Sequence, residues 1–140
     1  MRFRFYALFG FLFLFCLSLD VLMFGGLSQE AGIGQAIADS ARAQAPLTHT
    51  YIVLGRPIAT RIPAARTAGQ SIADAGFGDA YDDIQTTPDA AADLLFAASR
   101  GPMRALLVLS YWAAPAFFLL TLLAWIFRTR HTHLIKSARR

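Results

Sequence analysis

Two long apolar runs dominate the hydrophobic pattern of the chain. The first extends from Phe5 to Leu27 and the second from Ala105 to Phe127, each 23 residues long. A helix rising about 1.5 Å per residue needs about 20 residues to cross the hydrocarbon core of a bilayer. The Phe–Leu alternation between Phe9 and Phe15 resembles a strand, but an isolated strand leaves its backbone unpaired in lipid. The pattern therefore predicts two transmembrane helices.

The polar segment between the runs has weaker periodicity. Residues 28–44 can continue the first helix, because Ile33, Ile37 and Ala41 recur at a spacing of four. Residues 48–54 are rich in β-branched and aromatic side chains, so that a strand and a short helix both remain open there. Residues 56–70 contain two prolines and a glycine and are expected to be irregular.

Helix signals return before the second run. Residues 70–84 have a helical spacing that Gly76 and Gly78 weaken. Thr87-Pro88-Asp89 is typical of a helix start, and that helix should end at Arg100, before Gly101-Pro102. The predicted fold is an all-α membrane protein: two transmembrane helices in an antiparallel hairpin, joined by a mainly helical, partly irregular extramembrane segment.

Composition supports the membrane class. The 140 residues are 56% hydrophobic and 16% charged, against roughly 45–50% and about 25% in soluble domains. Of the 13 cations, 12 are arginines, and alanine is frequent, a bias typical of high-GC bacterial genomes. The single cysteine, Cys16, allows no intrachain disulfide, so cysteine usage does not identify the redox compartment.

The distribution of charge predicts the topology. Arg2 and Arg4 precede the first run without an acid, and a basic tail follows the second, whereas residues 28–103 carry five cations and eight acids. Positive flanks stay in the cytoplasm. We therefore expect a cytoplasmic N-tail (1–4), a first span (5–27), a periplasmic segment (28–103), a second span (104–127) and a cytoplasmic tail (128–140). The tail should face lipid headgroups through Arg128, Arg130, Lys136, Arg139 and Arg140.

A cleaved signal peptide is the alternative for the first run. Its basic start and apolar stretch fit that class, but no small-x-small pair follows promptly after Leu19. Ala43-Gln44-Ala45 has suitable residues but lies far downstream. The first run is therefore expected to be an uncleaved signal anchor.

Asp20 is the one ionisable residue inside the apolar runs. It lies about 22 Å along the first helix, toward the outer side of the bilayer. An interfacial carboxylate, or a pair with Arg104 at the start of the second span, is the structural interpretation; a proton or ion relay is the functional alternative. Tyr111, Trp112 and Trp125 are distributed like an aromatic belt at the membrane interfaces, and Pro115 predicts a kink near Ala114.

Enzymatic chemistry finds little support in the sequence. It contains no phosphate-binding loop, dinucleotide fingerprint, zinc spacing or nucleophile elbow. His49, the His131–His133 pair and the Asp79–Asp83 acidic cluster favour polar surface roles, and no cofactor, metal or nucleic-acid partner is expected. We expect a non-enzymatic inner-membrane protein, an accessory or scaffold subunit that contacts a membrane or periplasmic partner or a second copy of itself. The alternative is a membrane sensor or regulator of a periplasmic ligand or envelope state.

Overall fold

The computed structural model describes residues 4–30, 33–78 and 102–137, and every regular element in these ranges is a helix. The helices are α1 (Phe5–Leu27), α2 (Ile33–Gln44), α3 (Pro46–Arg61), α4 (Pro63–Phe77) and α7 (Pro102–Ser137). The expected helical fold is thus confirmed for the described part of the chain. The helix expected over 87–100 and the acidic cluster at 79–83 lie outside it.

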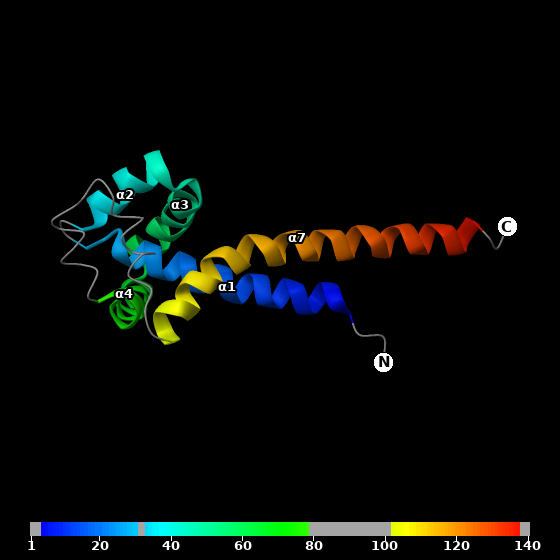
Figure 1. The fold of residues 1–140 in the computed structure, drawn as a ribbon, viewed down its shortest axis with the longest axis horizontal. Helices are drawn as coiled ribbons and strands as arrows, with labels where there is room; N and C mark the ends of the chain where they lie inside the picture. The colour runs from blue at the N-terminus through cyan, green and yellow to red at the C-terminus, as the bar shows by residue number, and fades with distance from the viewer. Residues whose placement is uncertain (1–3, 31–32, 79–101, 138–140) are drawn as a thin grey trace.

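Two apolar helices, α1 and α7, pack along each other and carry the rest of the molecule at one end (Figure 1). We call the part of this helix pair that no other helix covers, Phe5–Phe15 of α1 with the adjoining α7, the stalk. The head consists of Cys16–Leu27 of α1, helices α2, α3 and α4, and Pro102–Ala114 of α7. The first turn of α1 and the last turn of α7 both lie on the side away from the head (Figure 1).

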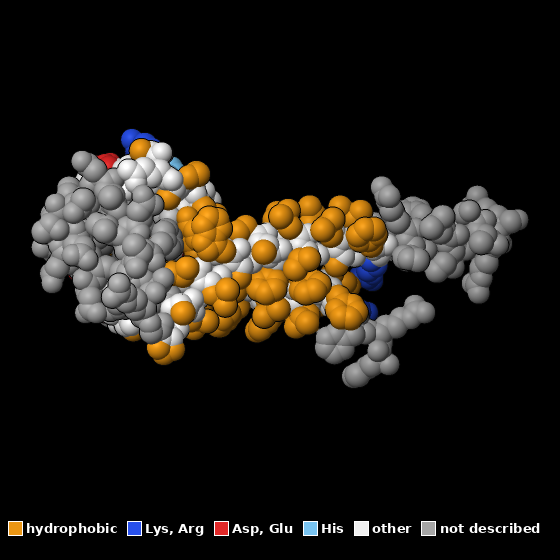
Figure 2. Space-filling view, in the orientation of Figure 1, with side chains coloured by type: hydrophobic (Ala, Val, Ile, Leu, Met, Phe, Trp, Pro, Cys, Tyr) orange, Lys and Arg blue, Asp and Glu red, His pale blue; other side chains and the backbone are white. Residues whose placement is uncertain are grey.

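Both helices are long and apolar enough to span a membrane, over Phe5–Leu27 and Ala105–Arg128. The core helix of a soluble protein would be mostly buried. Here only 28% of the apolar stretch of α1 and 22% of that of α7 is buried inside the protein. Figure 2 shows the stalk covered by hydrophobic side chains. The apolar surface of these helices therefore faces outward over most of their length.

Helix α3 settles the choice left open for residues 48–54, which are helical. The irregular segment expected over 56–70 is wrong, because α3 continues to Arg61 and α4 begins at Pro63. Proline is compatible with the first turn of a helix, where its missing N–H has no intrahelical partner. Pro57 lies inside α3, which is held by one buried face consisting of Thr48, Tyr51, Ile52, Gly55 and Ala59.

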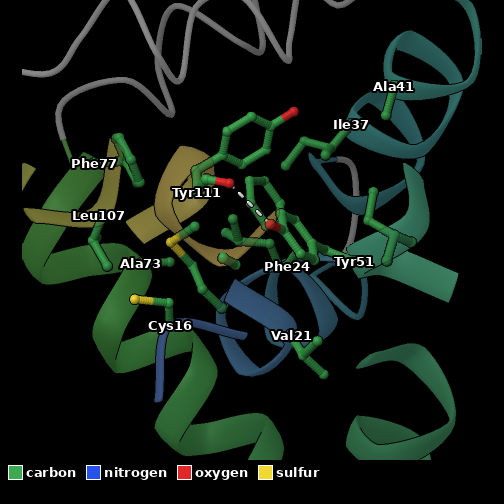
Figure 3. Packing of buried hydrophobic residues seen from close by; sticks show 14 residues of the cluster. Cys16, Val21, Phe24, Ile37, Ala41, Tyr51, Ala73, Phe77, Leu107 and Tyr111 are labelled. Atoms are coloured by element: carbon green, nitrogen blue, oxygen red, sulfur yellow. Dashed lines mark hydrogen bonds between the residues drawn. The ribbon is translucent and has the colours of Figure 1, made fainter. Parts of the chain in front are cut away.

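The sequence suggested that residues 28–44 continue the first helix, but α2 is a separate helix. The chain turns at 28–30, where the Gln29 amide bonds to the Gly26 carbonyl and the Glu30 amide to the Leu27 carbonyl. The turn brings Ile37 and Ala41 into the core, where both are fully buried (Figure 3). A continuous helix would have carried these two side chains away from the core.

Candidate functional site

The site is built around α1, which α3, α4 and α7 all contact. Two adjacent glycines of α1 each contact the backbone of a different helix. A Cβ atom on Gly25 would lie 2.7 Å from the backbone carbonyl of Gly55 in α3, and one on Gly26 would lie 2.8 Å from the carbonyl carbon of Gly69 in α4. Such distances are too short for any side chain, so the backbones touch directly. We call the Gly25–Gly55 and Gly26–Gly69 contacts the glycine crossings. Small residues allow the same close approach between membrane helices.

Asp20 lies beneath these crossings and is completely buried. The Ser110 hydroxyl of α7 donates to Asp20 Oδ1 at 3.0 Å and also lies 2.9 Å from the backbone carbonyl of Leu107. One hydroxyl proton therefore serves two acceptors. Asp20 Oδ2 is also buried and has no hydrogen-bond partner among the described residues. The site has more acceptors than donors.

The predicted partner of Asp20, Arg104, lies six residues before Ser110 in α7. Six residues correspond to about 9 Å along a helix. The Arg104 side chain lies outside the described part of the chain, so the Asp20–Arg104 pair remains a prediction. The partner that the structure does give Asp20 is a neutral hydroxyl on the neighbouring helix.

An aromatic cluster lies next to Asp20 and joins α1, α3 and α7 (Figure 3). The Phe24 ring stacks on Tyr51 with centroids 6.0 Å apart, and Tyr51 meets Tyr111 edge-on at 5.4 Å. The Tyr111 hydroxyl and the Thr48 hydroxyl are 2.9 Å apart, and either one can donate. These contacts hold α3 against the two long helices.

Tyr51 compensates for the proline of α7. Pro115 has no N–H, so the Tyr111 carbonyl four residues earlier loses its helical donor. The Tyr51 hydroxyl donates to this carbonyl at 2.9 Å. Burial is the main reason why the pKa of Tyr51 is raised well above its ordinary value, with smaller contributions from Asp20, Tyr111 and Cys16. The hydroxyl therefore keeps its proton as a donor at neutral pH.

The predicted interfacial aromatic residues divide into two groups. Trp112 and Trp125 are 64% and 55% exposed on α7, whereas Tyr111 is buried in the aromatic cluster and not part of the exposed belt. The Arg128 guanidinium lies over the Tyr6 ring, 4.7 Å from its centroid, and joins the two helices at the far end of the stalk. The side chains of Arg130, Lys136, Arg139 and Arg140 lie outside the described residues.

Sequence reasoning identified Asp20 but missed its surroundings. Ser110 is a small residue of the second apolar run whose sequence position does not indicate a partner, and the sequence did not predict the glycine crossings. The available signal was the Gly25-Gly26 pair inside an apolar run, followed by Gly55 and Gly69 in the next helices. Within the described residues, no three His, Cys, Asp or Glu side chains come together in a way that could hold a metal ion. The arrangement offers a buried carboxyl, the hydroxyls of Thr48, Tyr51, Ser110 and Tyr111, and the Tyr111 carbonyl that accepts from Tyr51.

Comparison with known proteins gives no relative: no family model, no curated protein and no solved structure matches this chain.

Proposed function

We propose that this chain is a non-enzymatic inner-membrane protein in which α1 and α7 form an antiparallel transmembrane hairpin. Both termini are cytoplasmic, and the head is on the periplasmic side. The protein acts as an accessory or scaffold subunit that presents its head and spans to a membrane or periplasmic partner. The acid-free arginine clusters flanking both apolar helices support this orientation.

The exposed apolar surface of the stalk is the observation that carries the proposal. Phe5, Phe11 and Leu14 are 60%, 66% and 59% exposed, and α7 is comparably exposed at Leu119 and Trp125. Monomeric soluble proteins rarely expose a contiguous apolar area of this kind. Lipid tails cover such a surface at no cost in hydration, which is why we assign it to the bilayer.

The place of α1 in the head supports its retention in the mature protein. Met23, Phe24 and Leu27 are all fully buried. Cleavage after Ala43-Gln44-Ala45 would remove α1 and α2 and expose the faces of α3, α4 and α7 that pack on them. A signal peptide does not contribute the central helix of the mature fold.

The alternative is a membrane sensor or regulator. Asp20 favours it, because a buried carboxyl with one unpartnered oxygen lies where the head joins the stalk. Ionisable residues within spans are functional candidates by default.

Topology and partner capture together test the proposal. Reporter fusions at Arg140 and near Ala65 should lie in opposite compartments, with Arg140 in the cytoplasm. Purification in mild detergent should then retain a stoichiometric protein partner or a second copy. A periplasmic Arg140 would contradict the orientation. A monomer whose stability responds to a small periplasmic molecule would favour the sensor.

A further inference from the structure

The part of α1 that belongs to the stalk is too short to cross a bilayer. Burial of α1 begins at Cys16, so the stalk includes only Phe5–Phe15, about 15 Å of helix. The hydrocarbon core is about 30 Å thick. If α1 spans the membrane, as proposed above, its next 15 Å must lie at membrane depth together with the helices that cover it.

The glycine crossings mark the outer boundary of this zone. Gly25 lies 20 residues beyond Phe5, which is about 30 Å along the helix. Gly25 and Gly26 are the points where α3 and α4 touch α1. Figure 1 shows α1 running along the long axis of the molecule, whereas α3 and α4 run across that axis rather than beside α1. In a membrane crossed by α1, these two helices lie close to the plane of the outer surface.

Helix α3 has the side chains that such a position requires. Leu54 and Ile58 are 48% and 39% exposed, one turn apart on the same flank of α3, beside its buried face. Ile62, one turn further along at the junction of α3 and α4, is 51% exposed. Figure 2 shows hydrophobic side chains continuing from the stalk onto the adjoining side of the head. We call Leu54, Ile58 and Ile62 the apolar edge.

Charge on these helices complements a lipid surface. The α3–α4 segment, 46–77, carries the exposed Arg56, Arg61 and Arg66 against one acid, Asp74, although the periplasmic segment as a whole is acidic. Interfacial helices combine an apolar face with basic residues that reach the headgroup phosphates. Acidic residues would be repelled by those phosphates.

We propose that α3 and α4 are interfacial helices seated in the outer leaflet, with the apolar edge inserted among the acyl chains and the three arginines at the phosphates. The head is then partly immersed in the outer leaflet, and its remaining surface faces the periplasm. This inference rests on the proposed membrane-spanning function, and it identifies the lipid surface as the partner of the apolar edge.

Nitroxide depth measurements test this placement on the full-length protein. Cys16 is first replaced by Ala, and single cysteines are introduced at Leu54, Ile58, Arg56 and Thr60 and labelled. The protein is reconstituted in vesicles of phosphatidylcholine and phosphatidylglycerol. Collision with oxygen reports lipid, and collision with a water-soluble nickel complex reports water. Leu54 and Ile58 belong to the apolar edge. Arg56 and Thr60 are matched exposed positions on another side of the same helix.

The expected result is oxygen contact at Leu54 and Ile58, at a depth of about 5–10 Å, with nickel contact at Arg56 and Thr60. Labels at Phe11 in the stalk and at Arg42 in α2 calibrate the lipid and water limits. Nickel contact at Leu54 and Ile58 with oxygen contact at Phe11 would overturn the interfacial placement and leave the spanning proposal intact. Shielding of the apolar edge from both reagents would also overturn it, since a protein would then cover that edge. Nickel contact at Phe11 would contradict the spanning function itself.

Discussion

At the scale of single residues, the polar groups of the head are paired across helices. Ser110 of α7 serves Asp20 of α1, and Tyr51 of α3 serves the Tyr111 carbonyl of α7. The sequence identified Asp20 because a charge in an apolar run is conspicuous. It did not identify Ser110 or Tyr51 as partners, because a serine in a span and a tyrosine in a mixed segment have many roles. Their roles depend on which helices meet.

Asp20→Asn tests the shortage of donors at the buried carboxyl. Asparagine retains an acceptor for Ser110, adds two N–H donors in nearly the same volume and carries no charge. We expect the variant to be at least as stable as the native protein in thermal unfolding in mild detergent. A marked loss of stability would mean that the charge of Asp20 is needed by a structural partner, as a pair with Arg104 would require.

The Asp20–Arg104 pair has its own test. If the two charges pair, removing either one should destabilise the protein more than removing both. We expect a coupling energy for Asp20 with Ser110 as well, from the hydrogen bond between them. A double-mutant cycle with Asp20→Ala, Arg104→Ala and Ser110→Ala measures both couplings. Additive effects of Asp20 and Arg104 would reject their pairing.

Tyr51→Phe removes the hydroxyl that donates to the Tyr111 carbonyl. A buried hydrogen bond contributes about 0.5–1.5 kcal/mol, so the free energy of unfolding should fall by that order. Pro115→Ala restores an N–H four residues after Tyr111 and should rescue Tyr51→Phe. Tyr6→Phe is the matched control, since it keeps the ring beneath Arg128. If Pro115→Ala gives no rescue, Tyr51 does not substitute for the missing helical donor.

At the scale of elements, the sequence predicted the long helices better than the short ones. The first apolar run coincides with α1 and the second lies inside α7. Runs of this length are easier to assign than short mixed segments, because each is too long for an ordinary strand. Residues 56–70 were misjudged, because Pro57 and Pro63 are local signals for breaks. Packing on α1 outweighs them: α3 and α4 each place a glycine against its backbone. The sequence around one glycine of a crossing does not indicate which distant glycine it will contact.

Gly25→Ala and Gly26→Ala should therefore destabilise the head, although alanine favours a helix by about 1 kcal/mol over glycine. The added methyl group would meet the backbone of α3 or α4, which has no side-chain freedom to move away. Gly10→Ala in the stalk is the control, because its Cβ would meet only a methyl of Thr121 at 3.7 Å. Chemical unfolding in detergent should separate the two groups. Equal effects at all three positions would argue against the crossings.

At the scale of the whole molecule, α1 has two roles along one helix. Its first half exposes large apolar side chains, and its second half is the centre of the head. A span and a core are usually separate segments of a membrane protein. If α1 spans the bilayer, as proposed above, the two overlap in one helix, and the packing of the head cannot change without disturbing the span. Hydropathy alone does not reveal this overlap, because lipid and a protein core select the same apolar residues.

Leucine replacement of each half of α1 separates the two roles. Replacing Phe5–Phe15 with leucines preserves an apolar helix, so both membrane insertion and the head should persist. Replacing Cys16–Leu27 with leucines should also preserve insertion. It removes Gly25 and Gly26 and places side chains where α3 and α4 touch the α1 backbone, so the head should unfold. Trypsin cleavage at Arg61 and Arg66 reports that unfolding, since cleavage within a helix requires local opening. If both replacements left these arginines equally resistant to trypsin, α1 would be an interchangeable anchor. The packing of its second half would then contribute nothing to the stability of the head.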